Sequence, residues 1–317
     1  MKADKQEIRR NNTNSIDIFK MFFCVCVICL HTEFLKNINM NEKISWVIEH
    51  WIFRMAVPFF FVTSGYFLAG KLDSKTRCVK PIKDYCIRLF KPLLFFESIN
   101  FLLPLIFVLY SRNSGNLISY AKSVILQAVF YPPGALWYVQ ASIIGAVVIY
   151  VLLSAFSKKM VLAIGVITYV FALICNNYYF VINGTMMKSL VDFYLSHCIS
   201  ARNGFFVGFP FLFIGMYMRY TKFSIFKHKY VQIIIPMVFA SETVIAFIMG
   251  NGMFADDGSL YFSQLLMAPL VLYWAWQKRT GLRIEQSLII RNLSTGMYFV
   301  HRIVLYILNI IASWGGD

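Results

Sequence analysis

The chain has few charged residues, and acidic side chains are the scarcer kind. Only 14% of its 317 residues are Asp, Glu, Lys or Arg, whereas an average soluble domain carries about 25%. Hydrophobic residues make up 59% and aromatic residues 17%. This shortage of charge excludes an ordinary soluble globular domain.

The chain also lacks the cysteine pattern of a disulfide framework or a metal site. Three of its seven cysteines, Cys24, Cys26 and Cys29, form the run CVCVIC inside an apolar segment. No His or Cys partner stands at ligand spacing, so we expect a packing role and no metal. Zinc-finger and aromatic-basic patterns are absent too, so we expect no nucleic-acid partner.

The apolar residues that are present fall in blocks of about 16–22, the length of a helix that crosses about 30 Å of hydrocarbon. The fold class predicted is all-α: one domain over residues 1–317, a polytopic transmembrane bundle of about 9–10 helices. The expected spans are 16–35, 51–70, 92–110, 135–155, 160–176, 204–219, 231–250, 259–277 and 293–314.

Basic residues predict the orientation. Of the 30 Lys and Arg residues, 22 lie in the segments 1–20, 71–91, 157–160, 219–229 and 278–291. These segments face the cytoplasm if the N-terminus does, which is the positive-inside pattern of a multi-pass protein in a bacterial-type cytoplasmic membrane. The net charge of +15 is then explained by topology and anionic membrane lipid.

Nine spans leave the C-terminus outside. Either a short helix at 284–293 is missing from this count, or a further span followed Asp317 in a longer parent chain, in which case the chain is truncated.

Two ionisable residues share one stripe of the first span. Lys20 and His31 are eleven residues apart, which on an α-helix places them within about 20° of one face and about 16 Å apart. Ionisable groups inside a bilayer are functional candidates. Arg88 and Lys91, three residues apart where the third span begins, present two more cations that suit a polyphosphate ligand.

Other polar residues interrupt the second, third and seventh spans. Arg54 and Ser64 stand in RMAVPFFFVTSGYFL, where Pro58 predicts a kink. A purely structural role for Arg54 requires that its side chain extend to the membrane edge. Glu97 and Glu242 are expected to pair with cations at that edge.

The fourth and last spans carry three further candidates. Trp137 and Tyr138 begin the fourth span, where anchoring in the aromatic belt is an equal alternative to a site role. His301 lies in the middle of the last span, where histidines line cavities or bond across helices.

These segments resemble the acyltransferase-3 family of integral membrane O-acyltransferases. Lys20 and His31 match the family's R-x10-H motif with lysine in place of arginine, and Arg88-Leu-Phe-Lys91 matches its R-x-x-R. RMAVPFFFVTSGYFL is similar to its second-span block, ALWYV to its fourth-span block and STGMYFVH to its late Ser-x-x-x-Tyr-x-x-His block.

The resemblance implies transfer of an acyl group, expected to be acetyl, from cytoplasmic acyl-coenzyme A to a hydroxyl of an extracytoplasmic glycan or related small acceptor. His31 would be the general base, and Lys20, Arg88 and Lys91 would hold the coenzyme phosphates. The substrate-binding candidates are Arg54, Ser64, Trp137, Tyr138 and His301. Lysine lacks the fork-shaped contact of arginine, so altered donor binding is expected.

A second interpretation comes from another class. SIDIFK…HT and VPFFFVTSGYFL also resemble the membrane half of the membrane-bound serine racemases of vancomycin-resistance systems, which implies a role in L-serine uptake. A racemase needs a pyridoxal-phosphate domain beyond this sequence. A non-catalytic sensor or flippase-like scaffold is the third interpretation.

Overall fold

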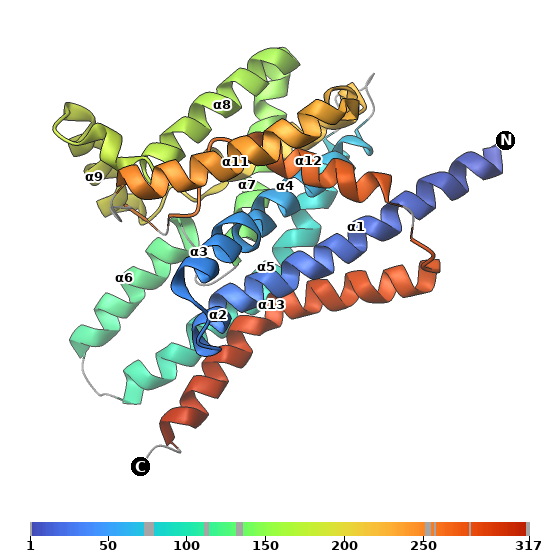
Figure 1. The fold of residues 1–317 in the computed structure, drawn as a ribbon. Helices are drawn as coiled ribbons and strands as arrows, with labels where there is room; N and C mark the ends of the chain where they lie inside the picture. The colour runs from blue at the N-terminus through green and yellow to red at the C-terminus, as the bar shows by residue number, and fades with distance from the viewer. Residues whose placement is uncertain are drawn as a thin grey trace.

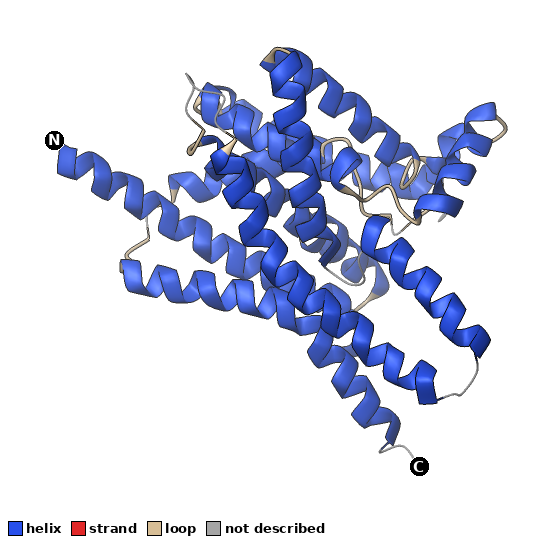
Figure 2. Cartoon of the chain, turned by 180° about the vertical axis from the view of Figure 1, so that it is seen from behind, coloured by secondary structure: helices blue, strands red, loops and turns tan. Residues whose placement is uncertain are grey.

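The computed structural model describes residues 2–72, 79–110, 114–130, 136–250, 255–256, 258–278 and 280–314. Its regular elements are helical and this part of the chain has no strand (Figure 2), so the predicted all-α class is confirmed. The α-helices are α1 Lys2–His31, α2 Phe34–Asn37, α3 Glu42–Trp51, α4 Ala56–Ala69, α5 Lys80–Tyr110, α6 Ser114–Phe130, α7 Trp137–Ala155, α8 Lys158–Ile174, α9 Met186–Cys198, α10 Phe209–Thr221, α11 Lys229–Gly250, α12 Gln264–Gln277 and α13 Ile284–Trp314.

Each of the nine expected spans coincides with a helical segment. Among the described residues, four helical stretches are long and apolar enough to cross a membrane: Asn14–His31, Glu42–Ala69, Trp137–Ala155 and Lys229–Gly250. This composition is that of a multi-pass membrane protein. The number of crossings stays a prediction.

Two helices are longer than the sequence pattern predicted. Helix α5 begins at Lys80, so Arg88 and Lys91 lie inside a helix that continues through the expected third span. Residues 73–78, which include Cys78, lie outside the described residues. Helix α13 begins at Ile284, so the suspected short helix at 284–293 is its first part.

The kink predicted at Pro58 stays a prediction, but the helix is interrupted just before this residue. Pro58 lies in the first turn of α4, where the N–H that proline lacks would have no helical partner. The 3₁₀ turn η1 (Phe53–Met55) separates α3 from α4 and contains Arg54, the residue four positions before Pro58. Arg54 therefore lies in a helix break and not within a helix.

The centre of the core is the contact between α4 and α10, where two glycines bring the helix backbones together. A Cβ atom at Gly65 would lie 1.9 Å from the Leu212 carbonyl oxygen, and one at Gly215 would lie 2.0 Å from that of Val62. Small residues permit such approach in membrane helices. Around this crossing Phe59 is fully buried.

Helices α1 and α13 lie side by side and run in the same direction (Figure 1). Asp17 of α1 accepts a hydrogen bond from the Ser287 hydroxyl (2.7 Å) and pairs with Arg291 (3.3 Å). The Cys24 thiol donates to the Ser294 carbonyl at 3.2 Å. These bonds fix α13 against the helix that carries Lys20 and His31.

For the two acidic residues expected to pair with cations, Glu242 and Glu97, the described contacts are different. Glu242 accepts hydrogen bonds from the Tyr178 hydroxyl and from the backbone N–H groups of Phe262 (2.5 Å) and Ser263 (2.7 Å). It thus satisfies donors at the start of α12, which would otherwise have no partner. Glu97 is buried, and its carboxyl oxygens have no partner among the described residues.

Replacing Gly65 by alanine should destabilise the protein by about 3 kcal/mol or more, because the new methyl group overlaps backbone that cannot move aside. The measurement is the melting temperature of the purified protein in detergent. Gly296→Ala is the matched control, since nothing lies within 4 Å of a Cβ atom there and alanine favours a helix. Equal melting temperatures for the two variants would contradict the close contact between α4 and α10.

Candidate functional site

A cavity of about 460 Å³ lies at the His31 end of α1. It is formed by helix ends and connecting segments that are distant in sequence. Its lining residues are Val27, Leu30, His31, Glu33, Lys36, Glu49, Phe53, Arg54, Val57, Pro58, Trp137, Arg202, Val207, Ser259, Leu260 and Tyr298. This volume suits a small ligand or the end of a longer one.

Three of the residues predicted from the sequence line this cavity: His31, Arg54 and Trp137. His31 is the last residue of α1, Arg54 lies in η1, and Trp137 is the first residue of α7. All three lie at helix ends, where polar atoms can reach the membrane surface. His31 is exposed and Trp137 is buried.

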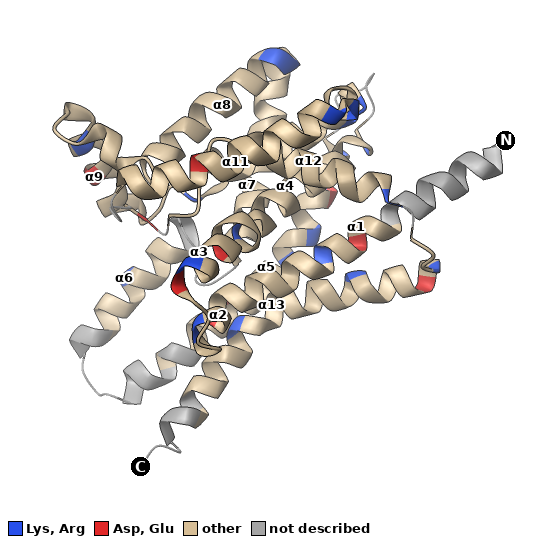
Figure 3. Cartoon of the chain, viewed as in Figure 1, with Lys and Arg blue, Asp and Glu red and all other residues tan. Residues whose placement is uncertain are grey.

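Charges of both signs surround the cavity. Lys36 donates a hydrogen bond to Glu33 at 2.8 Å, which lowers the pKa of Glu33 and raises the pKa of Lys36, so both stay charged at neutral pH. Glu49, Arg54 and Arg202 add one acidic and two basic side chains to the lining. Figure 3 shows acidic and basic residues together where α2 and α3 meet.

Ser64 and Tyr138 do not line the cavity but bond to each other, their hydroxyl oxygens 3.2 Å apart. The Tyr138 ring is 5.8 Å from the rings of Phe60 and Tyr298, measured between centroids. Because Tyr298 lines the cavity, this layer of rings and hydroxyls lies directly behind the cavity wall. Substrate contact by Ser64 and Tyr138 stays a prediction.

His301 does not line the cavity either. It is buried on α13, with its ring centroid 5.3 Å from that of His31. Its Nδ1 atom lies 2.7 Å from the Tyr298 carbonyl oxygen. The structure therefore brings two histidines together that stand 270 residues apart in the sequence.

The predicted cations at the other end of α1 gather only in part. Lys20 lies within electrostatic range of Arg88, Arg291 and Asp17, and its Nζ atom is 5.4 Å from the Phe67 ring centroid. Arg88 is exposed on α5, with its guanidinium 5.7 Å from the Tyr85 ring. Lys91 is exposed one turn further along α5. It is not among the charges of described residues that act on Lys20.

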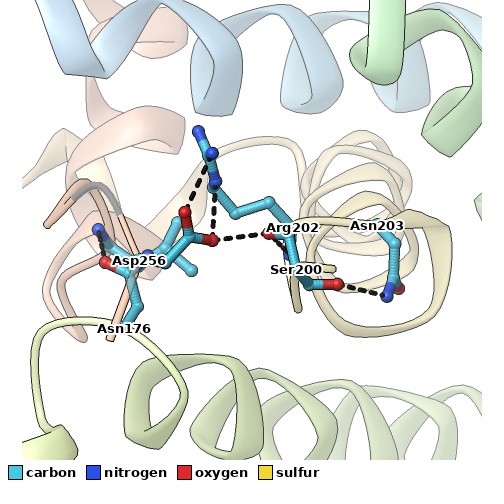
Figure 4. Close-up of polar contacts among 6 residues, drawn as sticks. Asn176, Ser200, Arg202, Asn203 and Asp256 are labelled. Atoms are coloured by element: carbon cyan, nitrogen blue, oxygen red, sulfur yellow. Dashed lines mark hydrogen bonds and ion pairs between the residues drawn. The ribbon is translucent and has the colours of Figure 1, made fainter. Parts of the chain in front are cut away.

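Arg202 links two segments at the cavity (Figure 4). Its guanidinium donates two hydrogen bonds to Asp256, each 3.1 Å long, and lies 5.7 Å from the Trp137 ring. Asp256 also accepts a bond from the Ser200 hydroxyl at 2.5 Å. Both charged side chains are about 15% exposed, so this forked pair is largely shielded from solvent and holds the two loops together.

Sequence reasoning missed several of these residues. Tyr298 belongs to the STGMYFVH block, so the motif itself contained the signal. Arg291 and Asp17 are spaced along two different helices, and Arg202 stands in a connecting segment that reads as solvated. Only the packing of distant helices brings those three to a site.

No metal centre was expected, and no group of three His, Cys, Asp or Glu residues in the described part of the chain is arranged to hold an ion. Cys24 and Cys26 are buried and Cys29 is half-buried. The Cys24 bond to α13 gives this cysteine a structural role.

Comparison with known proteins gives one family and three similar curated relatives. Residues 13–313 match the family described as "Acyltransferase domain". Two proteins of Enterococcus faecalis, each described as an amino-acid racemase, are 26% and 23% identical over 96% and 87% of the chain. A serine/alanine racemase of Enterococcus gallinarum is 28% identical over 64% of the chain.

The chain spans less than half the length of these relatives: the matches cover 43%, 38% and 29% of them. No solved structure matches the chain.

Asp256→Asn should destabilise the protein by about 1–3 kcal/mol, because it leaves the largely buried Arg202 charge without its carboxylate. Melting in detergent measures the loss, and hydrogen exchange over residues 199–203 should rise. Lys36→Gln breaks the fully exposed pair with Glu33 and serves as the control that leaves stability unchanged. Unaltered exchange in the Asp256 variant would rule out this pair as the link between the loops.

Proposed function

We propose a function from the premise that the chain belongs to the acyltransferase-3 family, whose acyltransferase domain it matches over residues 13–313. The protein is a membrane O-acyltransferase with its N-terminus in the cytoplasm. It takes an acyl group, expected to be acetyl, from cytoplasmic acyl-coenzyme A. It transfers that group to a hydroxyl of an extracytoplasmic glycan or related acceptor.

One observation carries the proposal: a cation cluster and a histidine-bearing cavity lie at opposite ends of α1. Lys20 with Arg88 and Arg291 outnumbers the single nearby acid, Asp17. This excess of positive charge suits the phosphates of the coenzyme. At the other end His31 faces a cavity of about 460 Å³, large enough for one sugar or a molecule of similar size.

A series of neighbouring side chains leads from one end to the other. From the cavity it runs through Tyr298 to Tyr138, with ring centroids 5.8 Å apart. The Tyr138 hydroxyl is bonded to Ser64 and within electrostatic range of Tyr85, whose ring contacts Arg88. These hydroxyl groups offer hydrogen bonds to the amide groups of a pantetheine arm, which must reach across the membrane core.

The chemistry assigned to His31 is general-base catalysis. Its imidazole removes the proton of the acceptor hydroxyl while that oxygen forms a bond to the acyl carbonyl carbon. The carbon–sulfur bond of the thioester breaks, and the coenzyme leaves as a thiolate that is then protonated. Arg54 lies in the same cavity and can stabilise the negative charge that develops on the carbonyl oxygen.

His31→Gln should lower acetyl transfer by about a hundredfold or more, since it removes the base without removing hydrogen-bonding capacity. The assay follows radiolabelled acetyl groups from acetyl-coenzyme A into envelope material of cells that produce the protein. His197→Gln, on the exposed face of α9, is the control and should retain full activity. A folded His31→Gln protein with undiminished transfer would refute the catalytic role.

Lys20→Met should raise the KM for acetyl-coenzyme A about tenfold while kcat changes little, because one charge-assisted phosphate contact is lost. Lys91→Met should have a smaller effect, since Lys91 is not among the described charges that act on Lys20. Steady-state kinetics with purified protein separates the two constants. A fall in kcat at unchanged KM would argue against donor binding by Lys20.

A second candidate function, uptake of L-serine or a related amino acid, rests on the cavity charges and the relatives. Glu33 and Glu49 lie in one lining with Arg54 and Arg202, a combination that suits the ammonium and carboxylate of a zwitterion. The relatives are described as amino-acid and serine/alanine racemases. Serine uptake into proteoliposomes that is indifferent to acetyl-coenzyme A would favour this function over acyl transfer.

A further inference from the structure

The hydrogen bond made by His301 fixes its tautomer. Its Nδ1 atom lies 2.7 Å from the Tyr298 carbonyl oxygen. A carbonyl oxygen only accepts, so Nδ1 carries the hydrogen and donates. In the neutral ring the other nitrogen, Nε2, is then a hydrogen-bond acceptor.

This acceptor is buried without a partner. His301 is 6% exposed, and its Nε2 atom makes no hydrogen bond to any described residue. A buried polar atom left in this state destabilises the folded protein. Such an atom calls for an explanation.

The neighbouring side chain supplies one. The ring of His31 lies 5.3 Å from that of His301, inclined by 32°. A protonated imidazole carries N–H groups on both nitrogens and is a donor only. When His31 gains a proton, His301 Nε2 is therefore the acceptor that a small rotation of the His31 ring would reach.

We propose that His301 is a positioning residue that accepts a hydrogen bond from protonated His31 and so stabilises the charged form of the base. The inference rests on the proposed acyl transfer. The proton comes from the acceptor hydroxyl, stays on His31 while the carbon–oxygen bond forms and the carbon–sulfur bond breaks, and then passes to the thiolate. His301 itself neither gains nor loses a proton.

The surrounding charges explain why a neutral acceptor is used. Arg54 and Arg202 line the His31 cavity and oppose a further positive charge there, whereas Glu49 favours it. The Glu33–Lys36 pair contributes both signs.

Around His301, Arg302 follows on α13 and acts on it electrostatically. Glu97 follows Phe96 of α5, whose ring stacks on Phe299 of α13 at 5.0 Å. The positive charge of Arg302 opposes a proton on the His301 ring, which leaves its acceptor available.

Two substitutions test the two ring nitrogen atoms of His301 separately. His301→Asn retains an N–H group near the Nδ1 position but has no acceptor at Nε2, whereas His301→Gln places an amide oxygen near Nε2. His197→Asn is the matched control: its Nδ1 atom also lies against a carbonyl oxygen of its own helix, that of Phe193 at 2.8 Å. All variants are made in the full chain and checked for folding by size-exclusion chromatography and melting.

The first measurement does not depend on activity. Diethyl pyrocarbonate modifies neutral imidazole, and peptide mass spectrometry reports its reaction with His31 as the pH is varied from about 5 to about 9. In His301→Asn the midpoint for His31 should fall by about one pH unit. In His301→Gln and His197→Asn it should stay at the wild-type value.

The second measurement is acetyl transfer from acetyl-coenzyme A. His301→Asn should lower kcat by about tenfold to a hundredfold at unchanged KM, with the acid limb of the pH profile moved to lower pH. His301→Gln should restore most of the rate. A merely structural role would not move the pH profile or distinguish these two variants.

An unchanged His31 midpoint in folded His301→Asn would overturn the inference, as would equal shifts in the Asn and Gln variants. If the wild type transfers no acetyl group, the proposed function fails, while the midpoint still decides the histidine contact. Should His301→Asn not fold, the nitrogen-15 shift of His301 Nε2 in the wild type replaces it. That shift must follow the titration of His31 and must become constant in His31→Gln, or the inference is wrong.

Discussion

The close contact between the backbones of α4 and α10 is the constraint on which the other packing depends. At Gly65 and Gly215 each helix presents only hydrogen atoms to a carbonyl oxygen of the other. Within a bilayer, where lipid is as apolar as a leucine side chain, such van der Waals contact replaces the hydrophobic effect as the force between helices. The position of α4 then sets the positions of Arg54, Phe60 and Ser64, the second-span residues in or behind the cavity wall.

The second element is α1, which is long enough to carry groups for both sides of the membrane. Its partner α13 is aligned by the bonds of Asp17 to Ser287 and Arg291. The same alignment places Tyr298 and His301 beside His31 at the other end. One packing interaction thus positions both the cation cluster and the cavity, which is why the two can be parts of one site.

Charge is distributed according to what each environment tolerates. At the cavity the ionisable groups lie at helix ends, and Arg202 pairs with Asp256. Deeper in the helices polar contacts are made by hydroxyl groups such as those of Ser64 and Tyr138. A buried neutral imidazole fits this pattern, since it offers an acceptor without the cost of a buried charge.

Much of the fold follows from the sequence alone: the apolar blocks determined the helices, and the eleven-residue spacing determined that Lys20 and His31 share one face of α1. Spacing within a helix is local, so it can be read from the chain. The approach of Arg202 to Asp256, of Arg291 to Asp17 and of His301 to His31 was decided only by the tertiary structure. Each of these pairs joins segments far apart in sequence, and which faces of two helices meet depends on the small residues at their crossings and on the whole set of neighbouring helices.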